Sequence, residues 1–120
     1  MKFTKEHEWL RVEGDVVVVG ITEHAAEALG DVVFIELPET ETMVSEGDEV
    51  VVIESVKAAS DILAPVDGEI VAVNAKLVDN PGLVNEDATG AAWFFKMKLD
   101  DLSVLDQFMD EDEYKELIGD

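Results

Sequence analysis

Lys57 is the residue of this chain whose setting best suits covalent chemistry. It lies in the run Glu54–Asp61, which reads Glu-Ser-Val-Lys-Ala-Ala-Ser-Asp and separates two apolar stretches that lead out to Gly47 and Gly68. Strand signals on both sides of a small, polar centre predict a β-hairpin with Lys57 at its tip. Small neighbours leave the amine within reach of a modifying enzyme, and acylation would remove its charge. An ordinary surface lysine is the simplest alternative, because lysine is mostly exposed.

The composition limits the classes of function. The chain has 120 residues, of which 48% are hydrophobic, so it can form one domain with a core. It has 8 Lys and Arg against 29 Asp and Glu, for a net charge of −21. Such a charge repels nucleic acids and anionic lipids, so we expect neither a nucleic acid nor a membrane as a partner. The acidity either keeps the protein soluble or steers it towards partners with basic patches.

Several kinds of catalytic and metal site lack their residues. The absence of cysteine excludes disulfides, thiolate catalysis and thiolate metal ligands. The two histidines, His7 and His24, are too few for a histidine-rich metal site. The sequence contains no nucleophile elbow, dinucleotide-binding glycine run or P-loop. We therefore expect a carrier or binding protein, with no catalytic residue and no metal site, rather than an enzyme.

The elements that position Lys57 are predicted to be mainly β-strands. Strands are expected over residues 9–12, 16–19, 31–37, 49–54, 60–64, 69–73 and 92–99. Thr22 and Gly30 delimit a short helix, as its N-cap and its C-cap. Residues 39–48 and 74–90 are expected to be loops. The acidic tail from Asp100 has the apolar spacing of one or two amphipathic helices.

The sequence resembles the H proteins of the glycine cleavage system, a family of lipoyl carriers. The resemblance covers nearly the whole chain and is most specific in the run around Lys57. The other matching segments are His7–Trp9, Gly20–Ala25, Leu29–Asp31, Glu36–Glu39, Ala64–Ile70, Val73–Asn74, Leu83–Asn85, Trp93 and Lys96. The family usually has glycine at the place of Glu41 and Pro-Tyr at the place of Ala88 and Thr89, so we expect these loops to differ.

The resemblance implies a fold and a domain organisation. The fold would be the barrel-sandwich hybrid of lipoyl carriers, mainly β, with two antiparallel sheets packed face to face. The short helix near 22–30 and the C-terminal helix or helices would pack outside the sheets. Residues 1–120 would form a single lipoyl-carrier domain, with a core at about 31–75 and extensions at both ends.

The resemblance also implies the function of a shuttle. Lys57 would bear lipoate in amide linkage, placed there by a lipoate-attaching enzyme. The arm would carry the aminomethyl group from glycine decarboxylase, the P protein, to aminomethyltransferase, the T protein. It would then deliver the dithiol to dihydrolipoyl dehydrogenase, the L protein. The chain would be a non-catalytic component of this multienzyme system; the alternative is an H-like protein that relays lipoate to other lipoyl-dependent complexes.

A cleft for the arm is a further implication of the resemblance. Glu8, Trp9 and Asp61 would contribute to a groove beside the N-terminal segment, where exclusion of water would protect the loaded arm from hydrolysis. The simpler structural interpretation places Trp9 in the core and leaves Glu8 and Asp61 in solvent.

Three other interpretations compete with this one. Biotin carriers have methionine on each side of the lysine, whereas Val56 and Ala58 stand here. Lipoyl domains of 2-oxoacid dehydrogenases usually have Asp-Lys-Ala and belong to longer chains. An acidic interaction module without a cofactor is the alternative from another class, and it predicts an unmodified Lys57.

The sequence also carries an expectation about location. It has no secretory signal at its start and no run of ~18 apolar residues that could span a membrane. We expect a cytoplasmic protein, or a mitochondrial-matrix protein if this is a mature eukaryotic form.

Overall fold

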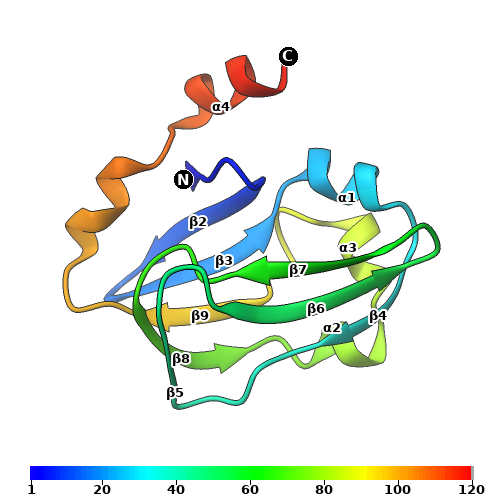
Figure 1. Ribbon diagram of the computed structural model, residues 1–120, viewed down its shortest axis with the longest axis horizontal. Helices are drawn as coiled ribbons and strands as arrows, with labels where there is room; N and C mark the ends of the chain where they lie inside the picture. Colours follow the sequence, from blue (N-terminus) through cyan, green and yellow to red (C-terminus); the bar gives the residue numbers. More distant parts are fainter. Residues whose placement is uncertain (120) are drawn as a thin grey trace.

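The computed structural model describes residues 1–119, which form nine strands and several short helices (Figure 1). The strands are β1 (Lys2–Phe3), β2 (Glu8–Glu13), β3 (Val16–Ile21), β4 (Val32–Glu36), β5 (Thr42–Val44), β6 (Glu49–Ser55), β7 (Ala59–Leu63), β8 (Gly68–Val73) and β9 (Phe95–Lys98). The helices are α1 (Glu23–Leu29), α2 (Lys76–Asp79), α3 (Leu83–Glu86), the 3-10 helix η1 (Leu102–Gln107) and α4 (Glu111–Ile118). None of the helices within residues 1–119 is long and apolar enough to cross a membrane.

The strands form two antiparallel sheets. The larger sheet has the order β1-β2-β3-β9-β8-β5, and the smaller one has the order β4-β6-β7. The prediction of a mainly β fold with two antiparallel sheets is therefore confirmed. The predicted hairpin is also confirmed, because β6 and β7 pair in register from Ile53 opposite Ser60 to Glu54 opposite Ala59, next to the turn. The turn lies beside α1 and β4 at the edge of the molecule (Figure 1).

Strand β3 is buried on both faces because separate groups of residues cover them. Successive side chains of a strand point to opposite faces. One face contributes Val17, Val19 and Ile21 to the main core, which also contains residues of the smaller sheet. The other face belongs to a second cluster, formed by Phe3, Trp9, Val18 and Tyr114. The C-terminal helix α4, which carries Tyr114, thus packs against the outer face of the larger sheet.

Helix α1 begins and ends where its sequence predicts. The Thr22 hydroxyl accepts a hydrogen bond from the Ala25 amide at 3.2 Å, as an N-cap does. Gly30 ends the helix with a φ of 75°, a backbone conformation that glycine adopts without a steric penalty. The predicted C-terminal helices are confirmed as well, as η1 and α4.

Two segments expected to be loops contain regular structure. Strand β5 lies within residues 39–48, and the short helices α2 and α3 lie within residues 74–90. Strand β5 exists because it pairs with β8. Just before it, Glu41 has a φ of 63°, so the place where the family usually has glycine keeps a backbone that suits glycine.

Candidate functional site

Lys57 lies in a tight, exposed turn between β6 and β7. The turn is closed by Ser55, whose amide donates to the Ala58 carbonyl at 2.8 Å. The Ser55 hydroxyl donates to the same carbonyl at 3.0 Å and accepts from the amides of Lys57 and Ala58 at 3.3 and 3.2 Å. The turn is also held from outside, because the Val56 amide donates to the Asp31 carbonyl at 3.0 Å. The backbone of the turn is thus fixed while its side chains stay in solvent.

The side chain of Lys57 follows the end of α1. A Cβ atom added to Gly30 would lie 3.1 Å from Cε and 3.4 Å from Cδ of Lys57. The aliphatic part of the lysine therefore lies against the bare backbone of Gly30. This contact directs the side chain towards α1.

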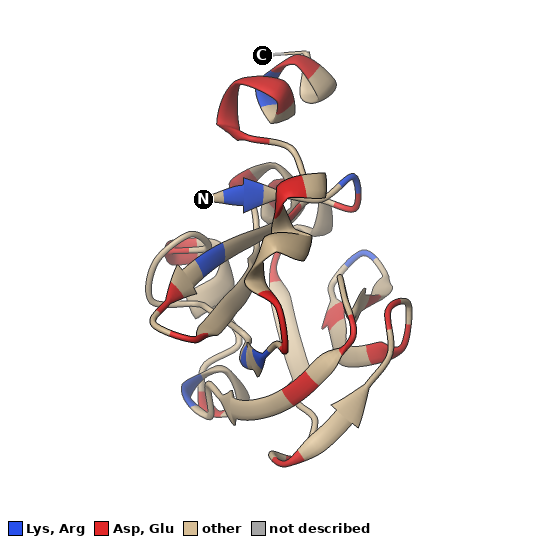
Figure 2. Cartoon of the chain, turned by 90° about the vertical axis from the view of Figure 1, so that its left-hand side faces the viewer, with Lys and Arg blue, Asp and Glu red and all other residues tan. Residues whose placement is uncertain are grey.

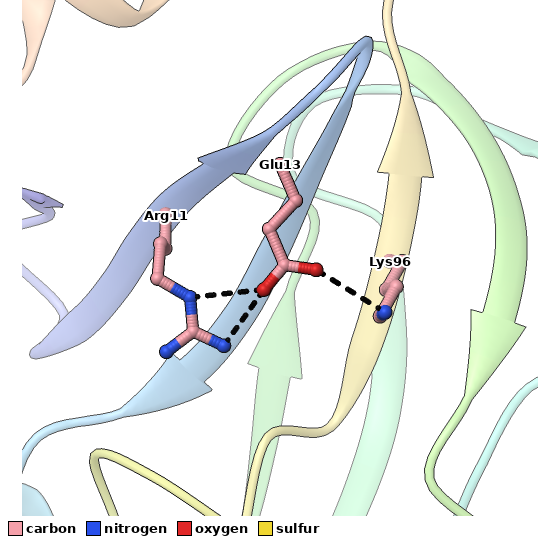
Figure 3. Close-up of polar contacts among 3 residues, drawn as sticks. All are labelled: Arg11, Glu13 and Lys96. Atoms are coloured by element: carbon pink, nitrogen blue, oxygen red, sulfur yellow. Dashed lines mark hydrogen bonds and ion pairs between the residues drawn. The ribbon is translucent and has the colours of Figure 1, made fainter.

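Lys57 differs from the basic residues that are engaged in ion pairs. Arg11 and Lys96 hold the carboxylate of Glu13 at 3.1 and 3.3 Å, on the outer surface of the larger sheet (Figure 3). The hydrogen bond from Lys96 is the main cause that lowers the pKa of Glu13. Among residues 1–119, Lys57 forms no ion pair. Acidic residues are spread over strands, helices and loops of the chain (Figure 2).

A groove of about 290 Å³ lies between α1, the N-terminal segment and the edge of β7. Its apolar lining includes Ile21, Ala25 and Leu29, and its polar lining includes Glu8 and Asp61. The groove reaches the last turn of α1, next to the glycine against which the lysine side chain lies. The structure thus brings Glu8 and Asp61 to the same groove, whose end lies near Lys57.

Glu8 is buried, with only 4% of its surface exposed, so the interpretation that left it in solvent is wrong. The Thr4 hydroxyl donates to its carboxylate at 3.2 Å. Burial raises the pKa of Glu8 to about 7, although the Thr4 hydrogen bond opposes this effect. Glu8 also lines a second cavity of about 360 Å³, which contains Phe3, Leu63 and Phe108. It can therefore exchange protons near neutral pH at the boundary between two cavities.

Trp9 is fully buried and does not line the groove. Its indole Nε1 donates to the Ala88 carbonyl at 3.0 Å. Its ring lies over Gly20 so closely that a Cβ atom there would be 2.5 Å from the indole. The core interpretation of Trp9 is the one that this placement supports. Asp61, by contrast, is exposed at the rim.

His7 is a residue of the groove that sequence analysis did not assign. Its Nδ1 lies 2.8 Å from the Tyr114 hydroxyl, which lies 2.7 Å from the hydroxyl of Thr22. Partial burial, and then the neighbouring His24 ring, lower the pKa of His7. In the sequence, the one indication that His7 could line the groove was its position directly before Glu8. Among residues 1–119, no cluster of His, Asp and Glu is placed to hold a metal ion.

Comparisons with known proteins agree with one another. The profile of the family described as Glycine cleavage H-protein matches residues 1–120. The glycine cleavage system H protein of Bartonella tribocorum is 52% identical over 117 residues, which cover 98% of this chain and 96% of that protein. The H protein of Acidiphilium cryptum is 51% identical over 118 residues, or 98% and 95% of the two chains. The crystal structure of a glycine cleavage system H protein from Mycobacterium marinum superposes with a TM-score of 0.88, at 38% identity, over 98% of this chain and 95% of that one.

Proposed function

The chain belongs to the glycine cleavage H-protein family, and on that premise we propose that Lys57 carries lipoate in amide linkage. The observation that carries this proposal is the exposure of Lys57 on a rigid turn, beside an apolar groove. An attaching enzyme needs an amine in solvent, and an attached aliphatic arm needs an apolar surface on which to rest. The amine of Lys57 meets the first requirement, because it forms no ion pair within residues 1–119. The groove meets the second, because Ile21, Ala25 and Leu29 line it.

The lipoyl group would supply a dithiol–disulfide pair, which carries two electrons and which a chain without cysteine cannot provide. The residues of the chain would bind and shield the arm. The apolar side of the groove excludes water from it. At the other side, the buried Glu8 can hold or accept a proton near pH 7, and Asp61 offers a charge at the rim. Trp9 would contribute by fixing the start of β2 rather than by contact.

The partners would be the enzymes that load, unload and reoxidise the arm. These are glycine decarboxylase, aminomethyltransferase and dihydrolipoyl dehydrogenase, together with a lipoate-attaching enzyme. The chain would be their carrier, with the catalytic groups on the enzymes. Its net charge of −21 favours partners with basic surfaces around their active sites.

The attachment is tested by mass spectrometry of the protein isolated from its native cell. We expect the mass increment of one lipoyl group, located at Lys57, and its complete loss in Lys57→Arg. The matched control is Lys76→Arg, since Lys76 is also exposed but lies on α2. An unmodified Lys57 in the native protein would contradict the proposal and favour an acidic interaction module.

The shuttle is tested separately from the attachment. In cells, Lys57→Arg should abolish glycine cleavage while other lipoyl-dependent complexes keep their lipoate. A loss of lipoate from those complexes would favour the relay function instead. For the groove, Glu8→Gln should change the rate at which protein loaded by glycine decarboxylase releases ammonia in buffer, and an unchanged rate would contradict a role for Glu8 in shielding.

A further inference from the structure

The segment that joins α1 to β4 is held from one side by Asn85. The Asn85 side-chain amide donates to the Gly30 carbonyl at 2.7 Å. Its side-chain oxygen accepts from the Val32 amide at 2.9 Å. These two bonds join residues that are 55 and 53 positions apart in the sequence. One exposed side chain of α3 thus pairs with the backbone as a neighbouring strand would.

The same segment supports the lysine turn from its other side. Asn85 forms hydrogen bonds with the Gly30 carbonyl and the Val32 amide. The Asp31 carbonyl between them faces the lysine turn instead. That carbonyl accepts the hydrogen bond from the Val56 amide at 3.0 Å.

The lysine side chain touches this segment too. Its Cε and Cδ atoms would lie 3.1 and 3.4 Å from a Cβ on Gly30. Gly30 combines a φ of 75° with a ψ of −156°, a region of the backbone map that is essentially restricted to glycine. The segment therefore offers the turn one hydrogen-bond acceptor and one flat surface for the lysine stem, and both depend on the path of residues 30–32.

The hydrogen bonds within the turn have a different role from the bond to Asp31. Ser55 fixes the shape of the turn, but its bonds join only residues 55–58. The bond from Val56 to Asp31 ties the turn to the segment that precedes β4. An enzyme that modifies Lys57, or receives its arm, gains rate when the turn is already oriented, because less motion is lost on binding.

We propose that Asn85 is a positioning residue for Lys57: it holds residues 30–32 so that Asp31 and Gly30 orient the lysine turn. The orientation of the turn follows from the bonds alone, whereas its consequence for modification rests on the proposed function. Asn85 does not touch the lysine. It acts through the backbone of the segment between them.

The first test uses the unmodified protein and needs no lipoate. Hydrogen exchange by NMR should be about tenfold faster at the Val56 amide in Asn85→Ala than in the wild type, since two hydrogen bonds are lost. The amide of Ile53, in the middle of β6, should keep its rate. Asn85→Asp keeps an acceptor for Val32 but sets a carboxylate oxygen against the Gly30 carbonyl, so its Val56 rate should also exceed that of the wild type. Asn80→Ala is the control, because Asn80 is also exposed and lies between α2 and α3, away from both hydrogen bonds.

The second test measures modification of the same variants by a lipoate-attaching enzyme. We expect kcat/KM to fall about fivefold in Asn85→Ala, with Asn80→Ala unchanged and a fall in Asn85→Asp as well. Equal exchange at Val56 in Asn85→Ala and wild type would overturn the proposal. So would faster exchange that spreads equally to Ile53, since that marks a general loss of stability, or unchanged modification despite local exchange at Val56. If the wild type accepts no lipoate, the proposed function fails, while the exchange at Val56 still decides whether Asn85 orients the turn.

Discussion

The start of β2 lines the groove and the lysine turn lies near its end, but the two regions are held by different forces. The turn is exposed and depends on hydrogen bonds from Ser55 and to Asp31. The start of β2 is buried, with Trp9 packed on Gly20 and Glu8 bonded to Thr4. An attachment point has to be oriented while its side chain stays accessible. The wall of a groove that protects the arm has to exclude water. The difference teaches why the turn can offer an amine to an enzyme, whereas burial in the wall raises the pKa of Glu8.

The largest effect on stability is expected from Trp9→Ala at the buried side. Removal of a fully buried tryptophan should lower the free energy of unfolding by about 3–5 kcal/mol. Urea titration measures this value. Val12→Ala is the control, because Val12 lies on the same strand but is exposed, so its effect should be small. A loss for Trp9→Ala as small as that of the control would remove the contrast between the two regions.

A second effect should appear in the pH dependence that Glu8 confers. Its pKa rises from 4.5 to about 7 in the folded state, so the folded protein keeps a proton that the unfolded chain has already released. Stability is then lost as the pH rises from about 4.5 to 7, by about 2–3 kcal/mol. In Glu8→Gln this loss should disappear.

The measurement compares urea titrations of Glu8→Gln and the wild type at pH 4.5 and 8. Glu116→Gln is the control, because Glu116 is exposed on α4 and should keep the slope of the wild type. If the free energy of unfolding changed with pH equally in the wild type and Glu8→Gln, Glu8 would not be shielded from water in the folded protein.

The smallest effect is expected at the turn, from Ser55→Ala. Loss of the exposed hydroxyl and its bonds should lower stability by about 0.5–1 kcal/mol. Amide exchange at Ala58 should speed up, while exchange in β3 stays unchanged. Ser45→Ala is the matched control, since Ser45 is exposed in another loop. A loss comparable to that of Trp9→Ala would show that the turn is part of the core, contrary to the comparison.

The parts of the fold that the sequence predicted carry their signals within a few residues. The helix between Thr22 and Gly30 has its own caps, and the hairpin around Lys57 has apolar arms and a small centre. The short strands were missed because they exist only through pairing with another strand. Strand β5 needs β8, and β1 needs β2. Helices as short as α2 and α3 have too few turns to form on their own.

The candidate site divides in the same way. The sequence predicted that Lys57 is displayed, and the structure confirms its exposure. The burial of Glu8 was not predicted, because it arises only in the fold, where Leu63 and Phe108, far away in the sequence, line the same cavity as Glu8. Neither His7 nor Asn85 could be assigned a partner, since Tyr114 and Gly30 meet them only in the fold.

The sequence by itself determined the displayed lysine, the strands beside it, the capped helix and the resemblance that the comparisons confirm. These depend on spacing, capping and residue type, which act locally. Only the tertiary structure decided that Glu8 is buried, that Trp9 lies in the core and that Asn85 holds the segment beside the lysine turn. The physical reason is that burial and hydrogen-bond partners come from residues far apart in the chain, and their meeting depends on how the two sheets and α1, α3 and α4 pack.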